Sequence, residues 1–296
     1  MHRLLATFLA PLALLANAPD LQAEDEMREI KAGQSVDLRA DRAYLLFRTP
    51  RMSGVPSFEP ILMRVPTMTE KARYEDAKKS AFERDLPKLR KEYERAMAKF
   101  AKRQDGGTAP SAPTLDTYNF TWDEVQNLQT VDFGDAFVKS KTQNTYLVEV
   151  PPGEYVLYGT TLSTGLPRLL VCFCLGTVGW DANAGQITDL GYFYADLAKS
   201  RSDVPELAAE TGYGPSSDAG GTPLMAATIR PARTQSFIPP DLADLPIAAA
   251  GHRAVGRFFN PNAAGINRLV PVAGILEYDG AKVIDPTTGE TVPDNF

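Results

Sequence analysis

Short apolar runs recur along most of the chain and predict β-strands. Each run has the length of a strand, is rich in β-branched or aromatic residues, and is bounded by glycine, proline or polar turn residues. The runs cover residues 43–48, 61–65, 145–150, 154–158, 168–175, 177–181 and 186–194. Residues 275–284 hold an Asp-Gly pair between two further runs, which is typical of a tight hairpin. The pattern predicts a mainly β protein.

Residues 69–103 have a different period and predict one long α-helix. They contain no glycine and one proline, Pro87, which should kink the helix because it lacks a backbone donor. Thr67 or Thr69 can cap the start. Apolar side chains recur three or four residues apart, so they lie on one helix face: Phe82, Leu86, Leu89, Tyr93 and Phe100.

The order of these patterns predicts an antiparallel β-sandwich with one long helical insertion and irregular C-terminal segments. Residues 24–296 are expected to form a single β-rich domain. Within it, residues 104–114 are rich in glycine and proline and predict a linker that returns from the helix to the sheet. Residues 197–250 are rich in Pro, Gly, Ser and Ala without a sustained period, and predict an irregular segment.

The N-terminus has the features of a signal peptide. Arg3 precedes an apolar stretch from Leu4 to Leu15, which is the length of a signal core and too short to span a bilayer. Leu-Gln-Ala ending at Ala23, followed by three acidic residues, is the expected cleavage site. We therefore expect residues 1–23 to be removed and the protein to be exported, periplasmic or secreted. No transmembrane segment is expected in the mature protein.

Net charge separates the helix from the rest of the chain. The protein has 296 residues, a formal charge of −6 and a pI of about 5.1, which argues against general nucleic-acid binding. Residues 70–103 nevertheless hold 12 Lys and Arg against 7 Asp and Glu. This basic helix is interpreted either as an arm for anionic lipid, cell-envelope polymer or an acidic protein, or as a solvated face whose apolar stripe packs on the protein's own sheet. In the first case, the five apolar residues above are the interaction face.

Cys172 and Cys174 are the only cysteines, and they lie two residues apart in a predicted strand. Their side chains are therefore expected on one sheet face. The favoured interpretation is two small packed residues in the core. A disulfide or a redox pair is the alternative.

The remaining chemistry-bearing residues form no recognisable catalytic set. His252 is the only mature histidine, and a single histidine without an identified partner predicts a structural residue. Asp181 to Asp189 approaches a calcium loop, but Gly185 falls one position too early, so a turn is expected. The sequence contains no nucleophile-elbow, zinc or phosphate-loop motif. We expect no catalytic residue, no metal and no cofactor.

Residues 146–193 resemble a class of exported bacterial domains. The segment runs from a strand through Val-Pro-Pro-Gly-Glu-Tyr (150–155) to a strand pair ending Ala-Gly-Gln-Ile-Thr-Asp-Leu-Gly (184–191). This is similar to β-sandwich domains of the DUF2846 type and to prealbumin-like or carboxypeptidase-regulatory-like modules. The resemblance covers about a sixth of the chain and implies a fold and export, but no activity.

The expected function is that of a non-catalytic exported protein, a scaffold or binding module for a protein or a cell-envelope polymer. Two alternatives belong to other classes. One is a hydrolase with an unrecognised carboxylate site, and the other is a redox-linked protein that uses Cys172 and Cys174.

Overall fold

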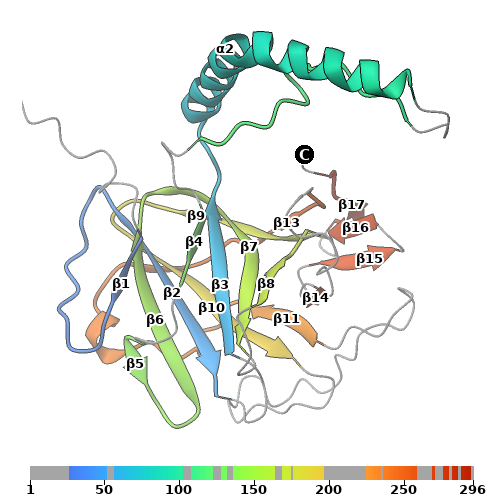
Figure 1. Cartoon of the computed structure of the whole chain (residues 1–296). Helices are drawn as coiled ribbons and strands as arrows, with labels where there is room; N and C mark the ends of the chain where they lie inside the picture. Colours follow the sequence, from blue (N-terminus) through green and yellow to red (C-terminus); the bar gives the residue numbers. More distant parts are fainter. Residues whose placement is uncertain are drawn as a thin grey trace, which may run out of the picture.

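The protein is mainly β, as the sequence predicts, with one α-helix and three sheets among the described residues. The computed structural model describes residues 27–51, 57–102, 108–122, 128–131, 136–163, 169–174, 176–196, 225–234, 236–258, 269–270, 276–279, 282–285 and 288–294. The predicted signal peptide, residues 1–23, lies outside these ranges. Figure 1 shows the sheets forming a body and the helix lying apart from it.

The largest sheet has eight strands and mixes both pairing directions. Its order is β1 (Arg28–Ile30), β6 (Gln143–Val150), β2 (Ala43–Pro50), β10 (Ile187–Asp196), β11 (Met225–Arg230) and β14 (Leu269–Val270), with β12 (Ile247–Ala249) beside β10 and β5 (Val138–Lys139) beside β6. β10 runs parallel to β2 and to β12, and β11 runs parallel to β14. The expectation of a purely antiparallel arrangement is therefore wrong here. These partners are distant in sequence, so no short hairpin turn sets their direction.

The second sheet has six strands, and every pairing in it is antiparallel. Its order is β13 (Arg253–Val255), β9 (Thr177–Ala182), β7 (Gly153–Ser163), β3 (Ser57–Arg64) and β4 (Leu128–Thr130), with β8 (Leu169–Cys172) beside β7. A third sheet contains β15 (Glu277–Asp279), β16 (Lys282–Asp285) and β17 (Glu290–Thr291). β15 and β16 pair antiparallel, which confirms the predicted hairpin strands.

Part of the segment expected to be irregular, residues 197–250, is regular. β11 and β12 both fall inside it, and a short 3₁₀ helix, η2 (Pro240–Leu242), lies between them. Both strands are rich in alanine, which has a low strand propensity. Pairing with β10 holds them extended, because sheet neighbours override local preference.

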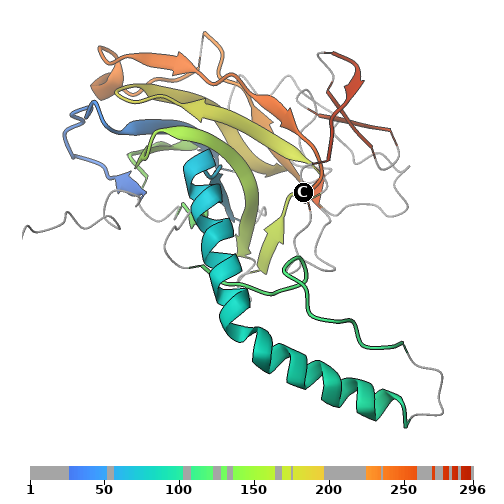
Figure 2. The same ribbon diagram turned by 90° about the horizontal axis from the view of Figure 1, so that it is seen from above.

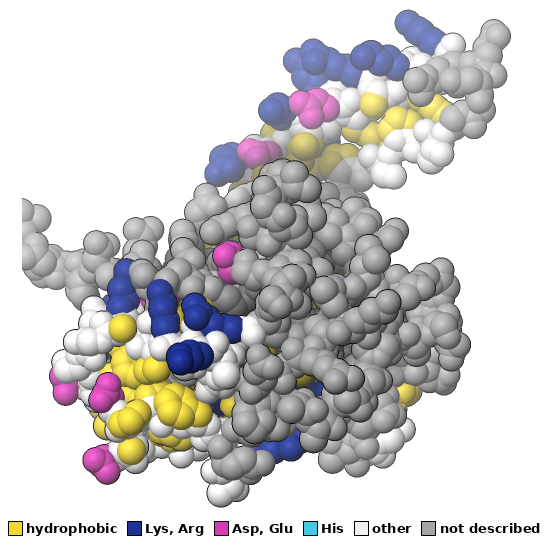
Figure 3. Space-filling model, turned by 90° about the horizontal axis from the view of Figure 1, so that it is seen from below, with side chains coloured by type: hydrophobic (Ala, Val, Ile, Leu, Met, Phe, Trp, Pro, Cys, Tyr) yellow, Lys and Arg dark blue, Asp and Glu magenta, His cyan; other side chains and the backbone are white. Residues whose placement is uncertain are grey.

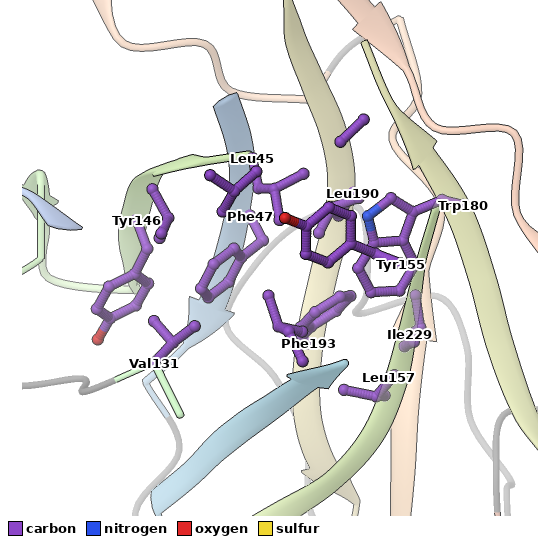
Figure 4. Close-up of a cluster of buried hydrophobic side chains, with 14 of the residues drawn as sticks. Leu45, Phe47, Val131, Tyr146, Tyr155, Leu157, Trp180, Leu190, Phe193 and Ile229 are labelled. Atoms are coloured by element: carbon purple, nitrogen blue, oxygen red, sulfur yellow. The ribbon is translucent and has the colours of Figure 1, made fainter. Parts of the chain in front are cut away.

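The main hydrophobic core takes side chains from both large sheets (Figure 4). Phe47 on β2 stacks between Tyr146 on β6 and Phe193 on β10, at ring-centroid distances of 5.2 and 5.3 Å. Trp180 on β9 of the second sheet lies 6.3 Å from Phe193 and is fully buried. These aromatic contacts connect strands of the two sheets and contribute both buried area and preferred ring geometry.

Helix α2 (Met68–Phe100) begins and ends within three residues of the predicted helix. Thr67 caps it, and Pro87 lies inside it. Figure 2 shows the helix changing direction along its length, which a missing backbone donor inside a helix explains. No helix among the described residues combines the length and the apolar character needed to cross a membrane.

Candidate functional site

The candidate site is a projecting arm, defined here as helix α2 together with the return segment, residues 108–122. Figures 1 and 2 show α2 leaving the end of β3 and extending away from both large sheets. Of its 33 residues, only Ala81 is buried. A helix of this length spans about 50 Å, so most of its surface is presented outside the β body.

The root of the arm is an ion pair combined with a capping box. Arg64, the last residue of β3, donates from Nη2 and Nη1 to the Glu70 carboxylate at 2.6 and 3.1 Å. The same carboxylate accepts the Thr67 backbone N–H at 2.7 Å, and the Thr67 hydroxyl accepts the Glu70 N–H at 3.2 Å. These contacts satisfy helix-start donors and tie the helix to the sheet. The Arg64 guanidinium lowers the pKa of Glu70 to about 2.

Aromatic side chains of the return segment cover the first half of the apolar stripe on α2. Tyr74 contacts Phe120 and Trp122 at ring distances of 5.6 and 5.9 Å. Phe82 meets the ring of Tyr118 edge-on at 5.4 Å. Each of these rings is partly buried. The first half of the stripe therefore packs on residues of its own chain that are not part of a sheet.

Polar contacts reinforce this packing. The Tyr118 hydroxyl donates to Asp85 at 2.7 Å, which lowers the pKa of that carboxyl and raises the pKa of the phenol. The Arg73 guanidinium lies over the Trp122 ring at 5.6 Å. Cation–π contacts of this kind add a modest attraction at exposed sites.

The five predicted interaction residues are all on α2, and each is partly buried: Phe82, Leu86, Leu89, Tyr93 and Phe100. They share one helix face, as the sequence predicts. Neither interpretation of the sequence anticipated the return segment as a partner of this face. A signal was nevertheless present, because Tyr118, Phe120 and Trp122 alternate with polar residues and so place their rings on one side of an extended chain.

Cys172 and Cys174 form a disulfide, with Cα atoms 5.2 Å apart. Both are buried, and Phe258 packs against them. The favoured interpretation, two packed cysteines without a bond between them, is therefore wrong. Their burial agrees with that interpretation. Cys174 follows the end of β8, and leaving the extended strand brings its Cα closer to that of Cys172 than two strand positions would.

His252 is held as a structural residue next to the core. Its Nε2 donates to the Leu190 carbonyl at 3.1 Å, and its ring lies edge-on to Trp180 at 6.0 Å. Burial lowers the pKa of His252, so the neutral ring is favoured at neutral pH. A neutral ring bound to a backbone carbonyl fits the structural role that the sequence predicts.

Two buried carboxylates are used in ion pairs. Asp189 receives two hydrogen bonds from the fully buried Arg48, at 2.7 and 2.9 Å, and also accepts the Gly191 N–H at 2.9 Å. Glu149 on β6 pairs with Arg28 and Arg42. Removing one partner of such a pair leaves an uncompensated buried charge, which costs about 3–5 kcal/mol. These carboxylates therefore have structural partners within the body.

The stretch from Asp181 to Asp189 joins the two large sheets. β9 ends at Ala182 and β10 begins at Ile187, so the expected turn is present, and it connects strands of different sheets. Gly185 has a φ of 68°, as a turn residue without a Cβ can adopt. Among the described residues, no group of three or more His, Cys, Asp or Glu side chains is placed to hold a metal ion.

Comparison of the chain with protein-family models, with curated proteins and with solved structures finds no match. The resemblance of residues 146–193 to exported bacterial domains stays a prediction from sequence.

Proposed function

We propose that this protein is an exported, non-catalytic binding module whose β body presents the arm to a protein or a cell-envelope polymer. The observation that carries the proposal is the arm itself. A helix of 33 residues with one buried side chain contributes little to the core of the body.

The arm has the features of a fixed element with an exposed surface. The Arg64–Glu70 pair fixes its root, and the aromatic contacts of the return segment support its first half. Isolated helices are marginal in water unless other contacts support them. Here those contacts lie on one side of α2 and leave the opposite side available to a partner.

The body is proposed to be a β-sandwich. Support comes from the core cluster, which joins Phe47 and Phe193 of the eight-stranded sheet with Leu62 and Trp180 of the six-stranded sheet. Two sheets that bury their facing side chains against one another are the defining feature of that architecture.

The test compares the complete mature protein with a variant in which residues 65–126 are replaced by Asn-Gly. Both proteins are immobilised and exposed to an envelope extract of the producing cell, and the retained material is identified. We expect material that the complete protein retains and the armless variant does not. Equal retention by both proteins, with the armless body shown to be folded, would contradict the proposal.

A redox-linked function is the second candidate, favoured by the disulfide between Cys172 and Cys174. Burial of both cysteines under Phe258 opposes it, because thiol–disulfide exchange needs access for an attacking thiolate. Thiol titration after mild reductant separates the two functions. Rapid, reversible reduction of the folded protein would favour the redox candidate.

A further inference from the structure

The positive charge of the arm is concentrated in the second half of α2. Residues 70–85 hold five basic and five acidic side chains, so their net charge is zero. Residues 86–103 hold seven basic and two acidic side chains. The excess of +5 that distinguishes this region from the acidic remainder of the chain therefore lies entirely in residues 86–103 of the sequence.

Five of these cations form one row, which we call the basic stripe: Lys88, Lys91, Arg95, Lys99 and Lys102. Lys88, Lys91, Arg95 and Lys99 lie on α2, where spacings of three, four and four residues place them within an arc of about 80° on a helix of 3.6 residues per turn. Lys102 follows in the turn after the helix. All five are exposed. Among the described residues, none of them forms an ion pair, whereas the nearby Arg84 is paired with Asp85 at 3.1 Å.

The basic stripe lies on the side of α2 opposite the apolar stripe. This arrangement disfavours a membrane as the partner, because an interfacial helix buries its apolar face in lipid and would then turn the basic stripe away from the headgroups. Figure 3 shows Lys and Arg side chains along one edge of the outer helix and apolar side chains along the other.

The composition of the basic stripe also disfavours a protein partner. Protein interfaces depend on buried aromatic and apolar anchors and are depleted in lysine. No large apolar side chain falls within this arc, and four of the stripe's five cations are lysines. Lysine binds phosphate as a point charge and needs no planar bidentate geometry.

From these observations we infer that the basic stripe binds a linear phosphate-bearing polymer laid along the outer half of α2. The four cations on α2 advance by about 4.5–6 Å each along the helix axis, so an extended chain carrying a charge at each repeat meets them over about 16 Å and meets Lys102 in the turn beyond. The inference rests on the proposed function, because it names the chemical class of the polymer that the arm would bind.

The experiment measures binding of long-chain inorganic polyphosphate to the full mature protein by fluorescence anisotropy as salt is varied. Five phosphate contacts predict a hundredfold or greater loss of affinity between about 50 and 200 mM salt. The variant Lys88→Gln/Lys91→Gln/Arg95→Gln should bind at least tenfold more weakly. Its slope of log affinity against log salt should be smaller by about 2.

The matched control is Lys71→Gln/Lys79→Gln/Arg90→Gln, which removes the same charge from exposed positions of α2 outside the stripe. It should bind within twofold of the wild type, and unchanged helical circular dichroism must accompany both variants. Equal losses in the two variants, or no binding by the wild type at low salt, would overturn the inference. Stripe-dependent binding to phosphatidylglycerol vesicles without binding to polyphosphate would also overturn it, in favour of a lipid surface.

Failure here is distinguishable from failure of the proposed function. Suppose that the complete protein retains material that the armless variant does not, while polyphosphate fails to bind. The arm is then a binding element whose ligand is not a phosphate polymer. If the armless variant retains the same material as the complete protein, the proposed function itself fails.

Discussion

At the scale of single residues, Glu70 joins the arm to the body. Its carboxylate accepts hydrogen bonds from Arg64 and from the Thr67 backbone, and it is mostly buried, with 15% of the side chain exposed. One charged group therefore serves both as the capping-box acid of α2 and as the partner of a guanidinium on β3. The attachment of the arm should therefore depend on the ionisation of Glu70.

The first prediction follows from the lowered pKa of Glu70, which falls from 4.5 to about 2. Because the folded state favours the ionised form, its stabilisation is complete above pH 4.5 and is lost as the pH falls toward 2. Glu70→Gln should destabilise the arm by up to about 3 kcal/mol at neutral pH, and the difference from wild type should shrink across that window. Amide hydrogen exchange in α2 measures this effect.

The control for this prediction is Glu75→Gln, since Glu75 is exposed on the same helix. It should leave exchange in α2 unchanged at neutral pH. A Glu70→Gln variant whose exchange in α2 matches wild type at neutral pH would show that the ion pair does not hold the arm.

At the scale of elements, the arm is stabilised by packing between a helix and an extended segment. Tyr74 contacts the rings of Phe120 and Trp122, and Phe82 contacts the ring of Tyr118. The first half of α2 is therefore covered by the return segment and does not need a sheet. Leu86 and Leu89 continue the same stripe beyond these aromatic contacts, and both are partly buried.

The second prediction concerns these two leucines. Leu86→Asp/Leu89→Asp places charges on the partly buried stripe, which should cost about 1–3 kcal/mol per group within the arm. Hydrogen exchange in residues 68–100 and 108–122 should accelerate, while the melting of the β body stays unchanged. Lys88→Asp/Lys91→Asp has the same spacing on the opposite face and serves as the control. A large fall in the melting temperature of the body would instead mean that the stripe packs on the sheets.

Local sequence patterns predict elements better than they predict partners. β2, β6, β10 and α2 lie within three residues of their predicted bounds, because a long run carries its own period. β3 starts four residues before its predicted run, and β7 ends five residues after its own. Short strands such as β1, β5 and β14 contain two or three residues, too few to show alternation. The parallel pairing of β2 with β10 depends on contacts between distant segments, and no local pattern records it.

The same reasoning applies to the candidate site. The face containing Phe82 and Leu86 followed from helical spacing alone, and the structure places both residues on it. The disulfide did not follow, because the extended geometry assumed for Cys172 and Cys174 keeps their Cα atoms further apart than the observed 5.2 Å. For both the helix and the cysteine pair, sequence spacing predicted which side chains share a face. Their contacts depend on the path of the backbone, which sequence spacing does not record.

At the scale of the whole molecule, the arm is an insertion between two adjacent antiparallel strands. β3 pairs with β4 so that Met63 lies opposite Leu128, which means that the chain leaves the sheet after β3 and returns beside the same strand. The ends of the insertion are therefore close together, and a short turn can join them. The body should not need the arm in order to fold.

The third prediction is that the variant with residues 65–126 replaced by Asn-Gly, a sequence that favours two-residue hairpins, folds into the same β body. It should keep its near-ultraviolet circular dichroism and melt only a few degrees lower, because Arg64 is buried and loses Glu70 as a partner. Adding Arg64→Met should recover part of that loss, since it removes a buried charge that no longer has Glu70 as a partner and keeps an unbranched side chain. If the shortened chain fails to fold in both forms, the arm supplies core stability, and its role as a presented binding element would have to be abandoned. If it folds, it lacks the whole basic stripe while its net charge changes by only one unit, because residues 65–126 hold 12 basic and 11 acidic side chains. The remaining acidic body should no longer bind polyphosphate at any salt concentration.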